Sequence, residues 1–86
     1  MEILFTKHAE EKFIVMKRLG WTLTKAQIKE TISSSQWRGS SRFGQKTAMT
    51  LVDKNHILRV IMNQEGDIIT VVTFHIARRG KYESTL

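Results

Sequence analysis

A chain of 86 residues without cysteine has room for one domain and can form neither a disulfide nor a thiolate metal site. Its formal net charge of +6 favours an anionic partner, with nucleic acid first and an acidic protein second, over a basic surface that only keeps the protein in solution. No apolar stretch approaches the roughly 20 residues of a membrane-spanning helix, and the opening MEILFTKH lacks the pattern of a secretion signal. We therefore expect a single cytoplasmic domain, residues 1–86, without membrane contact.

The first part of the chain predicts one short strand and two helices. Residues 2–5 are an apolar run typical of an edge strand, and a helix should follow from residue 6 or 7 to about residue 19, where Gly20 ends it. The side chains expected to face the sheet recur at helical spacing: Ala9, Phe13, Met16 and Leu19. Thr24 and Gln27 form a capping box, so a second helix should run to about residue 31 or 33.

The second part predicts three strands joined by short turns. Residues 36–45 contain two glycines and several polar residues, and we expect them to be a mobile loop. Strands are expected at residues 46–52, 57–62 and 68–76, with Gly66 supplying the positive φ that a hairpin turn needs. The predicted fold class is α+β, with two N-terminal helices packed on a mostly antiparallel sheet in the order β-α-α-β-β-β. The other face of this sheet would be partly open.

Residues that could carry chemistry are concentrated in the last two strands. Arg59 lies between two apolar residues of a predicted strand, so it would lie on the open face if the helices cover its neighbours. Thr73 and His75 share one face of the next strand. A one-residue slip of the hairpin exchanges the two faces, so the sequence leaves open whether they lie beside Arg59. The plain alternative is an ordinary strand threonine and a histidine at the sheet edge.

A second group of candidates is basic. Its members are Arg42, Lys46, Arg78, Arg79 and Lys81, with Tyr82 beside the last of them. Guanidinium groups bind phosphate through a planar fork, and an aromatic ring can stack on an unpaired base. His8 opens the first predicted helix, where the helix dipole does not stabilise a cation. The alternatives are a solvated basic terminus and a surface histidine.

Several classes of site are not indicated. There is no glycine-rich phosphate loop of nucleotide-binding spacing, and the serines at 33–35 lack the context of a catalytic nucleophile. The three histidines, His8, His56 and His75, do not have the spacing of metal ligands. We therefore expect no metal and no cofactor.

The layout and two short motifs resemble the RelE/BrnT-like ribonuclease toxins of bacterial toxin–antitoxin pairs. Residues 77–83, Ala-Arg-Arg-Gly-Lys-Tyr-Glu, are similar to the Ala-Arg-Arg…Tyr-Glu ending of BrnT-like toxins. Residues 6–12, TKHAEEK, are similar to the His-Ala-x-x-Arg/Lys opening of related small domains with the same layout. The resemblance extends over nearly the whole chain.

This resemblance implies a metal-independent endoribonuclease in which the ribose 2′-hydroxyl attacks the adjacent phosphate. Such a reaction requires a base, an acid and cations around the phosphate. Carried over by position, Arg59 and Arg78 would bind the phosphate, Tyr82 would stack or donate a proton, and His8 or His75 would be the base or acid. The surrounding substrate contacts would be Arg42, Lys46, Thr73, Arg79 and Lys81. The implied partners are RNA, including mRNA on the ribosome, and a cognate antitoxin protein.

Two other functions remain open from the sequence. One is a non-catalytic module of the same fold that binds nucleic acid or an acidic protein. The other is a purely structural or inhibitory protein that acts through a protein interface, with the exposed sheet edge and Trp37 as its contact surface.

Overall fold

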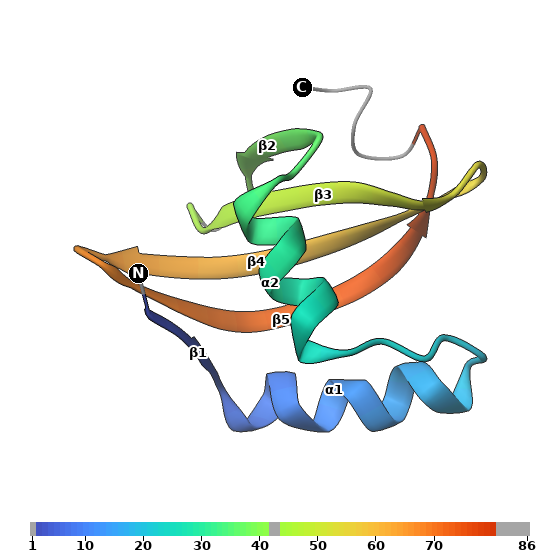
Figure 1. The fold of residues 1–86 in the computed structure, drawn as a ribbon, viewed down its shortest axis with the longest axis horizontal. Coiled ribbons are helices and arrows are strands. Elements are labelled where there is room, and N and C mark those ends of the chain that lie inside the picture. The colour runs from blue at the N-terminus through green and yellow to red at the C-terminus, as the bar shows by residue number, and fades with distance from the viewer. Residues whose placement is uncertain (1, 42–43, 81–86) are drawn as a thin grey trace.

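The fold is α+β, as predicted, and consists of one strand, two helices and four further strands in chain order (Figure 1). The computed structural model describes residues 2–41 and 44–80. Its elements are β1 (Glu2–Phe5), α1 (Lys7–Arg18), α2 (Lys25–Ser33), β2 (Trp37–Ser40), β3 (Lys46–Asp53), β4 (His56–Glu65) and β5 (Ile68–Arg78). None of the described helices is long and apolar enough to cross a membrane.

The five strands form one sheet in the order β1-β5-β4-β3-β2. Strands β2 to β5 pair antiparallel as a meander, and β1 pairs parallel with β5. The β4–β5 hairpin is longer than the sequence indicated, because both strands continue to a tight turn at Gly66 and Asp67. Gly66 has a φ of 59°, the left-handed conformation that glycine adopts most readily.

One prediction was wrong: residues 37–40, expected as part of a loop, form strand β2. Trp37 lies opposite Met49, and the preceding Gln36 donates its backbone N–H to the Met49 carbonyl at 2.9 Å. The Gln36 side chain also accepts a hydrogen bond from the Leu51 backbone N–H at 2.9 Å. Pairing with the edge of β3 thus orders a segment whose own glycine and polar residues favour no strand.

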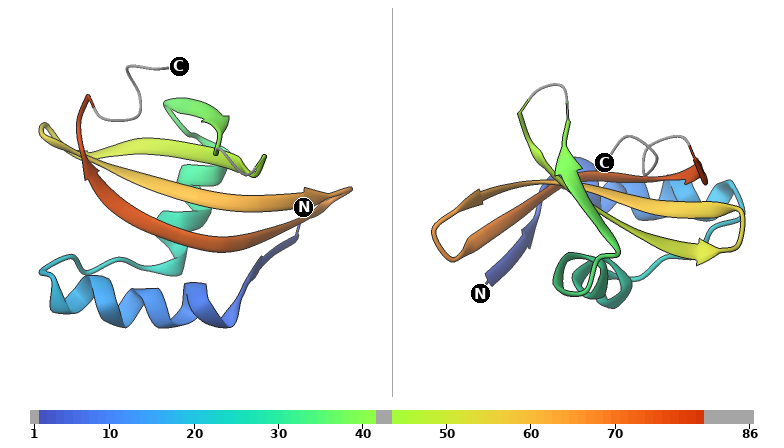
Figure 2. Two further views of the ribbon diagram at one scale, coloured as in Figure 1. Left: turned by 180° about the vertical axis from the view of Figure 1, so that it is seen from behind. Right: turned by 90° about the horizontal axis from the view of Figure 1, so that it is seen from above.

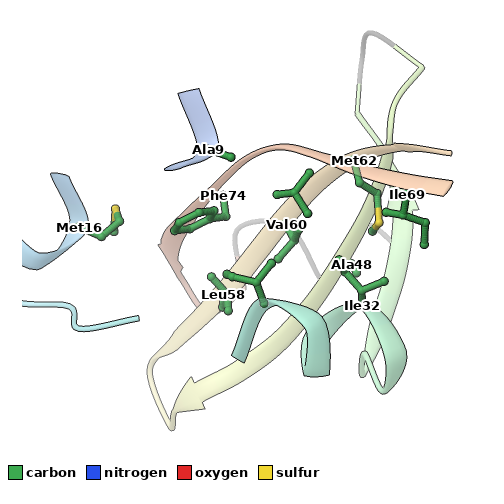
Figure 3. Packing of buried hydrophobic residues seen from close by; sticks show 11 residues of the cluster. Ala9, Met16, Ile32, Ala48, Leu58, Val60, Met62, Ile69 and Phe74 are labelled. Carbon is green, nitrogen blue, oxygen red and sulfur yellow. The ribbon is translucent and has the colours of Figure 1, made fainter. Parts of the chain in front are cut away.

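The core lies between the two helices and one face of the sheet. Helix α1 lies along β5, whereas α2 crosses β3 and β4 (Figures 1 and 2). Ala9 and Met16 from α1, with Ile28 and Ile32 from α2, meet a buried row of sheet residues (Figure 3). That row comprises Ala48, Leu58, Val60, Met62, Ile69, Val71 and Phe74. Leu19, expected to face the sheet, is instead 67% exposed at the C-cap of α1.

Candidate functional site

A β-bulge in β5 decides which side chains share a face with Arg59. Ile61 lies opposite Thr73, but the next residue, Met62, lies opposite Val71, so Val72 is an extra residue on β5. The bulge changes the phase of β5 by one residue and places His75 directly opposite Arg59. Of the two registers that the sequence left open, the structure has the one that brings Thr73 and His75 onto the face of Arg59.

The bulge is held in place by the cap of helix α1. The Thr6 hydroxyl donates to the Val72 carbonyl at 3.0 Å and accepts from the Ala9 backbone N–H at 3.1 Å. The Thr6 backbone N–H also donates to the Val71 carbonyl at 3.1 Å. One residue therefore begins the helix and satisfies two carbonyl groups at the bulge, where the regular ladder is interrupted.

Four side chains form a row across the sheet on the face opposite the core. Trp37 on β2 lies opposite Met49 on β3, Met49 lies opposite Arg59 on β4, and Arg59 lies opposite His75 on β5. Directly opposed residues have Cβ atoms about 4.5–5.5 Å apart, so each member of the row can contact the next. We call this the helix-free face, because both helices pack on the other side. Met49 is buried, whereas Trp37, Arg59 and His75 are half-buried.

Arg78 and Arg79 do not join this row. Arg78 is three residues beyond His75 on β5, so its side chain leaves the strand on the opposite face. It lies opposite His56, which begins β4, and the Arg79 backbone N–H donates to the Asn55 carbonyl at 2.8 Å. These residues line a shallow pocket of about 520 Å³ at the end of the sheet. We call it the end pocket; its lining residues are Lys54, Asn55, His56, Arg78, Arg79 and Gly80.

His56 in the end pocket is oriented by a carboxylate. Its Nδ1 lies 3.0 Å from Oδ1 and 3.1 Å from Oδ2 of Asp53. The Asn55 backbone N–H, which donates to Asp53 at 2.7 Å, is the main reason that the pKa of Asp53 lies below its usual value, and the bond to His56 adds to the effect. Asp53 is therefore ionised near neutral pH. An ionised carboxylate can only accept hydrogen bonds, so Nδ1 of His56 carries a proton.

The imidazole ring of His56 also contacts an aromatic side chain, that of Trp21. The rings of Trp21 and His56 are 5.0 Å apart between centroids and inclined at 62°, an edge-to-face arrangement. Trp21 lies in the connection between α1 and α2, so this contact attaches the connection to the end of the sheet. The imidazole is held from two sides, with Nε2 making no hydrogen bond to the residues that the structure describes.

The other candidates lie apart from both groups or outside the described residues. His8 is exposed on the first turn of α1. Lys46 lies opposite Met62, on the core side of the sheet, and its ammonium donates to the Gln64 side chain at 2.9 Å. The predicted contacts Arg42, Lys81 and Tyr82 lie outside the described residues. Among the described residues no group of three or more acidic, histidine or cysteine side chains could hold a metal ion.

The sequence did not single out Asp53 and His56. The sequence predictions name His56 only among the histidines that lack metal-ligand spacing, and Asp53 lies just after a predicted strand. An aspartate that begins a two-residue turn, with a histidine three positions later, is a local signal for an oriented imidazole, because the turn brings both side chains together. Trp21 is 35 positions away and has no such signal.

Comparisons of this chain with protein-family models, with curated proteins and with solved structures found no match. The fold and its sites therefore define a class by geometry alone: a basic α+β domain with a cation–imidazole row on one face of its sheet and a basic pocket at the sheet end.

Proposed function

We propose that this domain binds RNA and cleaves it without a metal ion, through attack of the ribose 2′-hydroxyl on the adjacent phosphate. The observation that carries the proposal is the direct cross-strand pairing of Arg59 with His75 on the helix-free face. A guanidinium and an imidazole at this spacing can contact the same phosphate group. Thr73, two residues from His75, lies on the same face and adds a hydroxyl group.

The chemistry that this row can supply matches the reaction. The Arg59 guanidinium would stabilise the negative charge that develops on the phosphorane. An imidazole can take up or release a proton, the role proposed for His75. Positioned acids and bases of this kind typically accelerate a reaction by about 10²–10⁴-fold.

Trp37 and the net charge support RNA as the substrate. Trp37 is half-buried and lies two strands from Arg59, which is about 10 Å at the usual strand spacing. An aromatic ring at that distance could stack on a base while the neighbouring phosphate lies against Arg59. The net charge of +6 favours a polyanion. The resemblance to RelE/BrnT-like toxins supports the same function and implies a cognate antitoxin protein as the partner that would cover this face.

A second candidate function is binding of RNA without cleavage. The observation that favours it is the shielding of two reactive atoms: Nε of Arg59 and Nε2 of His75 are both inaccessible to solvent in this structure. A histidine that transfers a proton to or from the substrate must present a nitrogen to it. A binding face has no such requirement.

One paired experiment separates the two functions. Purified protein is incubated with a single-stranded RNA in EDTA and resolved on a gel, while binding of the same RNA is titrated at several salt concentrations. A ribonuclease should give cleavage that persists in EDTA, and His75→Ala should reduce the rate by about 10²-fold or more. Arg59→Ala should weaken both cleavage and binding. The matched control is Lys29→Ala, which removes one exposed charge from α2 and should leave both unchanged.

The outcomes are distinct. Intact RNA together with salt-sensitive binding that Arg59→Ala weakens would assign the binding function and exclude the ribonuclease. Cleavage that His75→Ala leaves unchanged would refute the proposed role of the row. If the protein neither binds nor cleaves RNA, both functions fail, and a protein partner on this face becomes the remaining explanation.

A further inference from the structure

The end pocket differs in chemistry from the helix-free face. The charged residues among the described lining of the pocket are cations, namely Lys54, Arg78 and Arg79. It is open to solvent, and with about 520 Å³ it has room for a phosphate group with part of a nucleoside attached. His56 and Arg78 leave the sheet on the core side, so the pocket is separated from Arg59 and His75 by the thickness of the sheet.

The backbone around the end pocket is held in place at three points. Asp53 accepts hydrogen bonds from the Asn55 backbone N–H and from Nδ1 of His56, which fixes the turn between β3 and β4. The Asn55 carbonyl accepts from the Arg79 backbone N–H at 2.8 Å, which ties this turn to the end of β5. The pocket is therefore built on two strands whose relative position is set before any ligand arrives, and this lowers the entropic cost of binding.

His56 gives the pocket a hydrogen-bonding group of defined orientation. Since Nδ1 is engaged by Asp53, Nε2 is the nitrogen that remains for a ligand. Against an anion, Nε2 acts as a donor when the ring is protonated. Trp21 contacts the ring, so any change in the charge or position of His56 should alter the fluorescence of this tryptophan.

We propose that the end pocket is a second binding site, specific for a phosphate group, with Arg78, Lys54 and His56 as its contacts. Arginine suits this role because its planar fork matches two phosphate oxygens, and lysine adds a mobile point charge. The phosphate could belong to a nucleotide, to an RNA terminus or to the RNA backbone. The inference uses none of the residues of the helix-free face and does not depend on cleavage of RNA.

The test follows Trp21 fluorescence in a Trp37→Phe background, because the chain has two tryptophans. Three probes distinguish the sources of the phosphate: inorganic phosphate, a nucleoside 3′-monophosphate, and an RNA oligonucleotide without terminal phosphates. Saturable binding of the first two alone indicates a terminal phosphate, whereas saturation by the oligonucleotide as well indicates the backbone. Each of these results supports the site.

The variants assign the contacts. Arg78→Ala should weaken binding of the tightest probe by about 10- to 100-fold, as expected for loss of hydrogen bonds between charged groups. His56→Gln should change the fluorescence response, and it keeps a polar side chain at the position. Lys29→Ala, which removes an exposed charge on α2, should leave the affinity within about twofold. Circular dichroism of each variant confirms that the domain is folded.

The inference is overturned if none of the three probes gives a saturable change in Trp21 fluorescence, or if a folded Arg78→Ala variant binds as tightly as its parent. RNA cleavage is measured with Trp37 present, in the wild type and in His75→Ala, whereas phosphate binding is measured in the Trp37→Phe background with and without His75→Ala, and this separates the site from the proposed function. If His75→Ala loses RNA cleavage and keeps phosphate binding, both proposals hold. Phosphate binding without any cleavage rejects the ribonuclease alone, and cleavage without phosphate binding rejects the end pocket alone.

Discussion

Thr6 connects the start of helix α1 to the bulge in β5 through one hydroxyl group, so its replacement by alanine should destabilise the domain strongly. Loss of an N-cap side chain typically costs about 1 kcal/mol. The same change leaves the Val72 carbonyl without its hydroxyl donor, which adds about 1–3 kcal/mol for a shielded acceptor. Together these give about 2–4 kcal/mol, or a fall in Tm of roughly 10–25 °C for a domain of this size.

The control for Thr6→Ala is Thr24→Ala at the start of α2. Thr24 caps its helix in the same way, through the Gln27 backbone N–H at 3.2 Å, but it is exposed and its side chain bonds only within its own turn. The difference between the two variants in urea denaturation therefore isolates the bond to Val72. Thr6→Ser keeps the hydroxyl and should recover most of the stability. If Thr6→Ala costs no more than Thr24→Ala, the hydroxyl does not stabilise the bulge.

Three further predictions concern single positions. Phe74→Ala should cost about 3–5 kcal/mol in urea denaturation, because Phe74 is fully buried with its ring 4.7 Å from that of Phe13; a loss below about 2 kcal/mol would mean that the core collapses onto the gap. The pKa of Asp53 is lowered in the folded state, so its contribution to stability is present above its unfolded value near 3.8 and is lost as the pH falls through the folded value. Between about pH 5 and pH 2, Tm should fall less steeply with pH for Asp53→Asn than for the wild type. Identical curves of Tm against pH for the two proteins would count against the bonds to this carboxylate. Leu19→Lys should change the unfolding free energy by less than about 0.5 kcal/mol, since this side chain is 67% exposed, and a larger loss would place Leu19 in an apolar contact.

Features set by neighbours along the chain were predictable from the sequence. The capping box of Thr24 and Gln27 is present in the structure, and both helices begin and end within about two residues of the predicted positions. The three long strands and the fold class were also predicted. In each case the information lies in a few consecutive residues, because a cap or a strand pattern needs no distant partner.

The bulge has a visible signal that a simple strand pattern does not use. Ile69 and Val71 are buried at odd positions, whereas Phe74 is buried at an even position, so the two-residue period of apolar residues changes phase between them. In a regular strand, either Phe74 or Val71 would point away from the core. The phase change is therefore visible in the sequence, but the bulged residue, Val72, is hydrogen-bonded to Thr6, which lies 66 positions away.

Other features depended on contacts that no local pattern shows. Strand β2 exists because the edge of β3 pairs with it, and the segment has little strand propensity of its own. The contact between Trp21 and His56 joins the connection between α1 and α2 to the start of β4, and no local pattern indicates it. The pairing of His56 with Arg78 follows the register of the β4–β5 hairpin, so it could be predicted only after the bulge was known.

Residues 75–79 form one basic cluster in the sequence, but successive residues of β5 lie on opposite faces of the sheet. His75 and Arg78 are three positions apart and therefore leave β5 on opposite faces. β1 pairs with β5 only at residues 68–71. In the described part of the sheet, the rest of β5, including His75 and Arg78, is therefore an edge with no further strand beside it. An RNA chain that contacted both Arg59 on the helix-free face and Arg78 in the end pocket would have to pass around this edge of β5 or around the end of the sheet. A single phosphate cannot bridge the two groups, and this is why we propose separate sites for cleavage and for phosphate binding.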